Sequence, residues 1–225
     1  MYYSQCQQDQ YLNEKYFKNK TNGFFVDVGA YDGVTGSNSL FFEESLDWSG
    51  ICIEPLPEIY DNLIVNRSSD NIKCAIDVEE GKVDFIRNTG YTEQISGIAK
   101  YYDKRHYDRL LREIDGLEGD GGVHPGAGNT ETIVVNTMRL ETIFDEHDVS
   151  FVDYLSVDVE GAELQVMKSV DYDNVHVDII GFEDNFPDNS MKVVEFLQSK
   201  GFGMLGKLGY DIFMVNEKSK HWKET

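Results

Sequence analysis

The stretch FFVDVGAYDG, residues 24–33, decides the fold. Three apolar residues run into Asp27, and Gly29 and Gly33 follow in a D-x-G-x-x-x-G pattern. The pattern is typical of a buried strand that ends in a tight turn beside a ligand, because glycine allows backbone conformations and close approaches that other residues resist. The dinucleotide fingerprint G-x-G-x-x-G is absent, since no glycine stands two residues after Gly29.

Composition limits the partners that the chain can bind. The 225 residues include 41 acidic and 20 basic side chains, for a formal net charge of -21. Nucleic acids and anionic lipids need a concentrated basic face, so neither is expected as a partner, and a neutral or cationic small molecule suits the chain better. The acidity also has a simpler interpretation, which is solubility.

The chain is expected to be a soluble, cytoplasmic protein. No apolar run approaches the roughly 20 residues that cross a bilayer, so no membrane span is predicted, and the polar start MYYSQCQQDQ is unlike a signal peptide. Cys6, Cys52 and Cys74 are odd in number and lack metal-ligand spacing. They are interpreted as core residues in a reducing compartment.

Short β-rich runs alternate with stretches of helical periodicity. We expect strands at residues 23–29, 50–55, 71–76, 132–137, 153–160 and 177–183, and helices at 8–17, 37–46, 57–67, 139–147, 162–170 and 191–200. Residues 82–87 are expected to pair with 71–76, and residues 202–216 to form a closing hairpin. The alternation predicts an α/β fold, with a mostly parallel sheet, helices on both faces and an antiparallel C-terminal hairpin. Ligands of such sheets bind beyond the carboxyl ends of the strands.

The pattern weakens in residues 88–130. We expect residues 1–225 to form a single domain in which this stretch is a variable lid or acceptor segment, because long loops in compact domains are usually functional. Residues 99–114 favour a helix, and the glycine-rich residues 115–129 a loop. The segment also offers aromatic side chains that could stack on a sugar ring or pack the loop: Tyr91, Tyr101, Tyr102 and Tyr107.

An acid also closes the second strand. Glu54 and Pro55 follow the apolar run ICI, where an acid can accept hydrogen bonds from ribose hydroxyls. A nucleoside that meets acids instead of a pyrophosphate cradle suggests S-adenosylmethionine, with Asp27 toward its amino acid end. The alternative is an ordinary strand–turn–helix with a structural glycine.

A second group of acids lies in VDYLSVDVEGAEL, residues 152–164. Asp158 and Glu160 follow the core of a strand, and Glu163 begins the next helix, where an acid is favourable without any ligand. Asp158 is different, because an acid near a buried strand end is costly unless it is paired or bound.

With these motifs the chain resembles the FkbM-type S-adenosylmethionine-dependent methyltransferases. The matching blocks are SQCQQDQYL, GFFVDVGAYDGVTGSNSLFFEE, WSGICIEPLPEIYDNLIVNR, VDYLSVDVEGAELQVMKSVD and IIGFEDN, in the family's order. The resemblance implies a class I methyltransferase fold, which is a Rossmann-like three-layer sandwich. It also implies O-methylation of a hydroxyl, commonly on a sugar of a glycan or glycoconjugate.

The resemblance further implies a set of cofactor contacts. Ala75 and Ile76 are expected near the adenine, and the N-terminal segment with Gln5, Gln8 and Asp9 is expected to fold over the cofactor. The full cofactor-binding set is Gln5, Asp27, Gly29, Ala30, Gly33, Ser37, Asn38, Glu54, Pro55, Ala75, Ile76 and Asp158.

A hydroxyl acceptor needs help in losing its proton. The catalytic candidates are Asp158 and Glu160 at a strand end and His124 in the variable segment, with His106 as a further histidine there. Asp184 and Asn185, together with Asp158, resemble the metal ligands of the catechol-type O-methyltransferases, and oxygen ligands suit Mg²⁺ or another divalent cation. The alternative is that Asp184 and Asn185 are turn residues before Pro187.

Three other functions compete with this interpretation. An NAD(P)-dependent oxidoreductase is disfavoured, because the Y-x-x-x-K from Tyr11 to Lys15 precedes the glycine turn. A non-catalytic module that binds the cofactor or a glycan on the same fold remains an alternative. So does O-methylation of a small molecule that is not a sugar.

Overall fold

The computed structural model describes residues 1–114 and 128–224. Within these ranges a seven-stranded sheet has the order β10-β11-β9-β8-β1-β2-β3. Its strands are β1 (Phe24–Val28), β2 (Ser49–Ile53), β3 (Asp70–Ile72), β8 (Phe151–Val157), β9 (His176–Glu183), β10 (Phe202–Leu208) and β11 (Asp211–Asn216).

The main sheet is parallel except at β11. β1 pairs in parallel with both β2 and β8, and β8 pairs in parallel with β9. β11 runs antiparallel to β9 and to β10, so the predicted C-terminal hairpin is confirmed. The chain moves outward from β1 to β3 and then returns to the other side of β1 at β8. The carboxyl ends of β1 and β8 therefore form the switch point where ligands bind in sheets of this kind.

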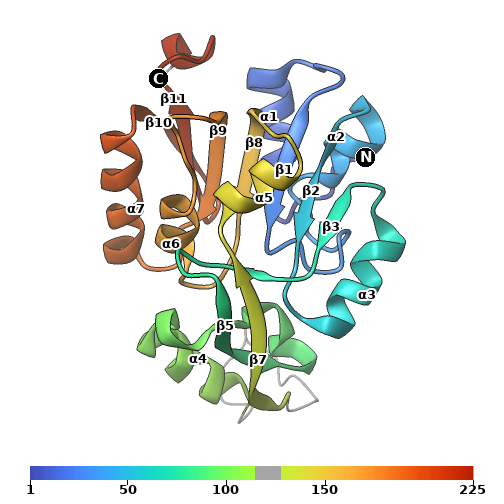
Figure 1. The fold of residues 1–225 in the computed structure, drawn as a ribbon, viewed down its shortest axis with the longest axis vertical. Coiled ribbons are helices and arrows are strands. Elements are labelled where there is room, and N and C mark those ends of the chain that lie inside the picture. Colours follow the sequence, from blue (N-terminus) through green and yellow to red (C-terminus); the bar gives the residue numbers. More distant parts are fainter. Residues whose placement is uncertain (115–127, 225) are drawn as a thin grey trace.

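Helices cover both faces of the sheet, as the alternating sequence predicts (Figure 1). One face packs against α5 (Leu140–Glu146), α6 (Glu163–Lys168) and α7 (Pro187–Ser199). The other face packs against α1 (Gln8–Leu12), the π-helix η1 (Asn13–Phe17), α2 (Leu40–Leu46) and α3 (Pro57–Asn66).

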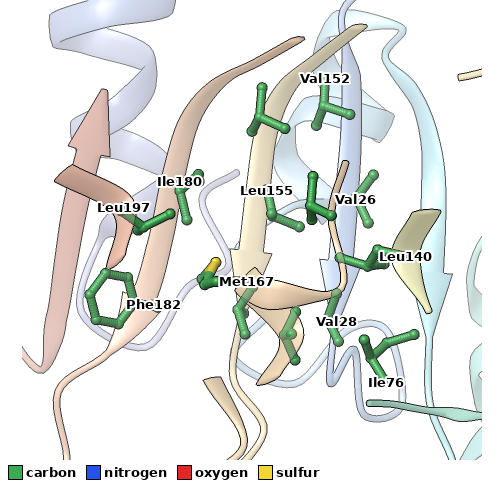
Figure 2. Close-up of a cluster of buried hydrophobic side chains, with 14 of the residues drawn as sticks. Val26, Val28, Ile76, Leu140, Val152, Leu155, Met167, Ile180, Phe182 and Leu197 are labelled. Carbon is green, nitrogen blue, oxygen red and sulfur yellow. The ribbon is translucent and has the colours of Figure 1, made fainter. Parts of the chain in front are cut away.

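The period of two along β1 sends side chains into two separate cores. Val26 and Val28 point into the cluster shared with Leu140, Met167 and Leu197 of the covering helices, as Figure 2 shows. Phe25 points the other way, into the cluster under α1 and α2. Each fully buried aliphatic or aromatic side chain stabilises the fold by about 1.5–3 kcal/mol. This double burial holds the end of β1 rigidly in the centre of the sheet.

A second, four-stranded sheet of order β4-β7-β5-β6 lies beyond the carboxyl ends of the main strands. It consists of β4 (Ala75–Ile76), β5 (Gly81–Asn88), β6 (Gly97–Ile98) and β7 (Thr130–Met138). The short helices η2 (Gly90–Ile95) and η3 (Ala99–Tyr101) and the helix α4 (Lys104–Ile114) accompany it, and Figure 1 shows β5, β7 and α4 below the main sheet.

The second sheet corrects two sequence predictions. The run NIKCAI is not one strand, because β3 ends at Ile72 and β4 pairs instead with β7. Residues 82–87 do not pair with 71–76; they belong to β5, which runs antiparallel to β7 from Gly81 to Asn88. Local β propensity predicts that a segment is extended, but it does not specify the partner strand.

In the ranges that the structure covers, no helix has the length and apolar character needed to cross a bilayer.

Candidate functional site

A cavity of about 1060 Å³ opens at the carboxyl ends of β1, β2 and β8, between the main sheet and the second sheet. Sites that enclose drug-sized ligands measure roughly 300–1,000 Å³, so the space suffices for a cofactor together with part of an acceptor. Eleven of the twelve predicted cofactor-binding residues line it: Gln5, Asp27, Gly29, Ala30, Ser37, Asn38, Glu54, Pro55, Ala75, Ile76 and Asp158.

The Gly29 turn brings β1 and β8 together at the cavity floor. Gly29 has φ +85°, and a β-carbon there would clash with the carbonyl oxygen of Asp158. The amides of Gly29 and Ala30 both donate to the carbonyl of Ile53, at 3.0 and 3.1 Å. The turn is thus fixed by backbone contacts with both neighbouring strands, and its first two N–H groups are already used within the protein.

Glu54 is held at the end of β2 by backbone amides. Its carboxylate accepts from the amide of Leu56 at 2.8 Å and from that of Tyr31 at 3.2 Å. Burial raises the pKa of Glu54 to about 7. Because a carboxylate offers about four lone-pair sites, two remain for hydroxyl donors from a ligand.

A roof over Glu54 comes from the segment after β5. The Tyr31 hydroxyl donates to Glu93 of η2 at 2.5 Å, and Thr92, Gln94 and Ser96 also line the cavity. Burial, followed by the hydrogen bond to Glu93, raises the pKa of Tyr31. The variable segment of the sequence therefore contributes one wall of the site.

The acid of the glycine motif is buried beside a hydroxyl. Asp27 is 5% exposed, and Ser39 donates its hydroxyl hydrogen to the Asp27 carboxylate at 2.5 Å. Burial raises the pKa of Asp27, and the nearby positive charge of Arg67 opposes that shift.

One lining side chain has an unused acceptor. The side-chain amide of Asn38 donates to the Ser156 hydroxyl at 3.4 Å, while its buried Oδ1 has no hydrogen-bond partner among the described residues. Because buried polar atoms are usually hydrogen-bonded, Asn38 Oδ1 indicates a place for a ligand donor.

Part of the cavity lining is apolar, and we call this part the apolar slot. It is lined by side chains from the loop before α3 and from the segments of the second sheet: Leu56, Cys74, Ala75, Ile76, Phe85 and Ile98. A flat aromatic ligand group suits such a slot.

The N-terminal segment lies across the cavity mouth. Ser4 pairs with Gly36 in a β-bridge, which brings Tyr3 and Gln5 to the cavity. Asp9 fixes this segment by accepting from the Tyr3 amide at 2.7 Å and from the Ser4 hydroxyl at 2.5 Å. Of the three expected N-terminal residues, Gln5 therefore lines the site, whereas Asp9 holds the segment in place.

Gln8 connects the N-terminal segment to β11 of the main sheet. Its side-chain amide donates to Asp211 at the start of β11, at 2.7 Å, and its carbonyl oxygen accepts from the Cys6 amide at 2.8 Å. Tyr210, next to Asp211, lines the cavity and is 63% exposed.

Three carboxylates gather at the ends of β8 and β9. One oxygen from each of Asp158, Glu160 and Glu183 lies within 4.8 Å of the others. The side-chain amide nitrogen of Asn185 donates to Glu160 at 3.1 Å and also to Glu183. Asp158 lies deep in the protein, yet its side chain is exposed because it faces the cavity.

The proximity of these acids shifts their pKa values. Burial, followed by the charges of Asp158 and Glu160, raises the pKa of Glu183 far above the ordinary value. Burial also raises the pKa of Asp158, whereas a hydrogen bond from Glu183 lowers it. Glu183 is therefore the protonated partner, and Asp158 accepts its hydrogen bond.

The predicted metal ligands need correction. Asp184 lies outside the cavity and accepts from Lys207 of β10 at 2.6 Å. Asn185 does reach the acids, but it presents its amide nitrogen to two of them. Oxygen ligands for a cation would instead come from Asp158, Glu160 and Glu183, which each bring one carboxylate oxygen to within 4.8 Å of the others. Carboxylate oxygens are the ligands that Mg²⁺ and Ca²⁺ prefer.

Gly33 is the one predicted cofactor residue that does not line the cavity. It has φ +81°, and a β-carbon there would lie 2.5 Å from Cγ of Arg67 and 2.8 Å from Cδ1 of Leu63. Its role is packing against the end of α3.

Two of the aromatic residues predicted from the sequence, Tyr101 and Tyr102, do not line the cavity. Tyr101 donates to Asp77 at 2.9 Å and Tyr102 to the carbonyl of Ile95 at 2.5 Å, so both pack the variable segment against its neighbours. His124 lies outside the described residues, as do the side chains of His106 and Tyr91. Glu163 accepts from the Gly161 amide at 2.9 Å, as a helix-capping acid does.

Sequence reasoning missed Glu183, Tyr31 and Glu93. Glu183 could have been found, because it ends an apolar strand just as Glu54 does, and adjacent strand residues point to opposite faces. The pairing of Tyr31 with Glu93 had no signal, since it joins two segments far apart in the chain.

Comparison with known proteins identifies the family. Residues 27–204 match the model of the family described as the methyltransferase FkbM domain. The chain belongs to this FkbM methyltransferase family. The methyltransferase sdnD of Sordaria araneosa is 27% identical over 167 residues, which are 67% of this chain and 61% of that protein. The chain thus spans about three fifths of the length of this curated relative.

One solved structure supports the fold, and a second has a lower similarity. A methyltransferase FkbM from Methylobacillus flagellatus KT superimposes with a TM-score of 0.51 at 11% identity, covering 88% of this chain and 44% of that one. A precorrin-6y C5,15-methyltransferase from Geobacter metallireducens GS-15 gives a TM-score of 0.43 at 10% identity, covering 87% of this chain and 80% of its own. The predicted class I methyltransferase fold of this FkbM family member is confirmed.

Proposed function

We propose that the protein transfers a methyl group from S-adenosylmethionine to a hydroxyl oxygen, with a sugar as the acceptor class. The observation that carries this proposal is the placement of Glu54 and Asp158 on one cavity, at the ends of the two strands that flank the Gly29 turn. Membership of a methyltransferase family supports the reaction type.

The lining residues fit this cofactor. Glu54 has lone pairs left for ribose hydroxyls, and the unpartnered Asn38 Oδ1 suits an ammonium donor. The slot with Ala75, Ile76 and Phe85 suits an adenine. No lysine, arginine or histidine lines the described cavity, which agrees with a ligand that has a sulfonium and no phosphate.

S-adenosylmethionine, when bound, supplies a methyl group on a positively charged sulfur. Asp158 is the group that receives the proton of the acceptor hydroxyl, because its carboxylate faces the cavity at the switch point. Glu183 donates to Asp158, and Asn185 donates to Glu160 and Glu183, so the acids keep a fixed arrangement. Holding reactants in line contributes about 7–11 kcal/mol to reactions of this kind.

Two aromatic side chains favour a sugar acceptor. Tyr3 and Tyr210 line the cavity and offer flat faces for a pyranose ring, whereas Tyr101 and Tyr102, expected in this role from the sequence, are used in packing. We further propose that residues 1–225 act as one domain, with residues 88–130 over the acceptor; the contribution of η2 to the roof supports this role.

The test is methyl transfer from isotopically labelled S-adenosylmethionine to a panel of free sugars, oligosaccharides and hydroxylated small molecules. The expected product is a sugar that carries one labelled O-methyl group, together with S-adenosylhomocysteine. Labelling of non-sugar alcohols alone would favour the small-molecule alternative. Cofactor binding without transfer to any member of the panel would favour the non-catalytic module.

A further inference from the structure

Arg67 is a buried cation at the end of α3, where its amide closes the helix by donating to the Leu63 carbonyl. The residue is 4% exposed and does not line the cavity. Its guanidinium lies 5.1 Å from the centre of the Phe25 ring. Arginine is seldom buried unless its donors are satisfied, so the partners of this side chain explain its position.

The guanidinium group donates hydrogen bonds to three residues of the loop between β1 and α2. Nη1 donates to the Gly33 carbonyl at 3.1 Å and to the Ser37 hydroxyl at 3.3 Å, and Nη2 donates to the Ser39 hydroxyl at 3.0 Å. The residues between these contacts, Thr35 to Asn38, line the cavity. Arg67 therefore supports that wall from the side opposite to the ligand space.

The guanidinium group of Arg67 is also linked to Asp27, the acid of the glycine motif, through the hydroxyl of Ser39. Ser39 accepts from Arg67, so its single hydrogen is left to donate to Asp27, at 2.5 Å. Arg67 thus fixes the direction of the Ser39 hydroxyl and brings positive charge near a buried carboxylate. The fourth contact, from Nε to Glu43 at 2.8 Å, lies on α2 away from the cavity.

We propose that Arg67 is a positioning residue for S-adenosylmethionine, which holds the loop 33–39 and the Asp27 carboxylate in the arrangement that binds the amino acid end of the cofactor. The inference rests on the proposed function, because it assumes that this cofactor occupies the cavity. This role requires the planar guanidinium group, whose donors point in fixed directions. A lysine cannot replace it fully, because its ammonium group is a single charged centre.

The experiment compares Arg67→Met, Arg67→Lys and Ser39→Ala with the wild-type protein. Calorimetric titration gives the Kd for S-adenosylmethionine, and urea unfolding of the unliganded proteins gives their stability. Arg67→Met should weaken cofactor binding by more than about tenfold, which corresponds to 1.4 kcal/mol. Arg67→Lys should recover only part of this loss, and Ser39→Ala should weaken binding while Arg67 is intact.

Two control variants separate positioning from general destabilisation. Arg139→Met removes another arginine that donates to a backbone carbonyl and a glutamate, and neither this arginine nor its partners line the cavity. Glu43→Gln removes the charge that contacts Arg67 from the outer side. Both should lower the urea midpoint and leave the Kd near the wild-type value.

The outcomes distinguish this inference from the proposed function. Wild-type protein that fails to bind S-adenosylmethionine would overturn the proposed function and this inference with it. Wild-type binding, with an unchanged Kd in folded Arg67→Met and in Ser39→Ala, would overturn the inference alone. If Arg67→Met does not fold, an unchanged Kd in both Arg67→Lys and Ser39→Ala has the same meaning.

Discussion

Gly29 and Asp158 meet so closely at the floor of the cavity that a β-carbon on Gly29 would overlap the Asp158 carbonyl. This contact brings the glycine turn of β1 to the end of β8. The proposed cofactor site therefore lies next to Asp158, the proposed base. The close approach explains why glycine is needed here on steric grounds, in addition to the φ of +85°.

Gly29→Ala should therefore lower the free energy of unfolding by more than about 2 kcal/mol, from left-handed strain plus the clash. Gly81→Ala is the matched control, because Gly81 also has a positive φ but a β-carbon there would meet no atom within 4 Å. Urea unfolding of both variants measures the difference. Equal losses in the two would show that the contact with Asp158 is unimportant.

Glu54 should make stability depend on pH. Its pKa is about 7 in the folded protein, above the ordinary value of 4.5, so the folded state holds a proton that the unfolded state releases between these values. Stability from this group is then full below about pH 4.5 and falls as the pH rises to about 7, at up to about 1.4 kcal/mol per pH unit.

Glu54→Gln should reduce this slope, and urea unfolding at intervals between pH 5 and 7.5 measures it. Because other buried acids titrate in the same range, the informative quantity is the difference between the two proteins in the slope of unfolding free energy against pH. Parallel pH curves for the two proteins would contradict the raised pKa.

Asp158→Asn should reduce kcat by about 10²–10⁴, the usual contribution of a general base. Asp184→Asn is the matched control, since Asp184 pairs with Lys207 outside the cavity; its kcat should stay near the wild-type value. Steady-state rates of S-adenosylhomocysteine release with a saturating acceptor test both. A comparable loss in both variants would favour the metal ligands first predicted from the sequence, which include both residues, and an unchanged kcat in Asp158→Asn would contradict its role as the base.

Glu183→Gln separates proton sharing from cation binding. Glu183 acts as a donor to Asp158 when it is protonated, and a glutamine amide can also donate, so the variant should retain most activity if no metal takes part. Activity in a chelator should then be unchanged for wild type and variant. Loss of activity in both experiments, with rescue of the wild type by Mg²⁺, would instead indicate a cation on Asp158, Glu160 and Glu183.

The sequence predicts the main sheet well because its signals are local. The apolar runs of β1, β2, β8 and β9 each have an acid at the last strand residue or next to it, and parallel strands bring such ends to one edge. Asp27, Glu54 and Asp158 therefore converge as expected. Pro57 at the first position of α3 gave a correct helix start as well.

The remaining site depends on tertiary contacts that have no local signal. The roof made by Tyr31 and Glu93 joins the glycine turn to a separate sheet, and the strand partners of β4 and β5 were unpredictable from propensity. The sequence favoured Asp184, but Glu183 lines the cavity and Asp184, the next residue after β9, does not, because successive side chains of an extended chain point to opposite sides. Gly33 matched the motif, but a glycine is required there because Arg67 and Leu63 leave no space for a side chain.

The most direct test of the central claim is calorimetric titration of the wild-type protein, Glu54→Ala and Asp184→Asn with S-adenosylmethionine. We expect saturable binding at one site per chain in the wild type and in Asp184→Asn, and binding weakened beyond detection in folded Glu54→Ala. A wild-type protein that is folded yet gives no binding heat, and no rise in thermal stability with the cofactor, would contradict the account.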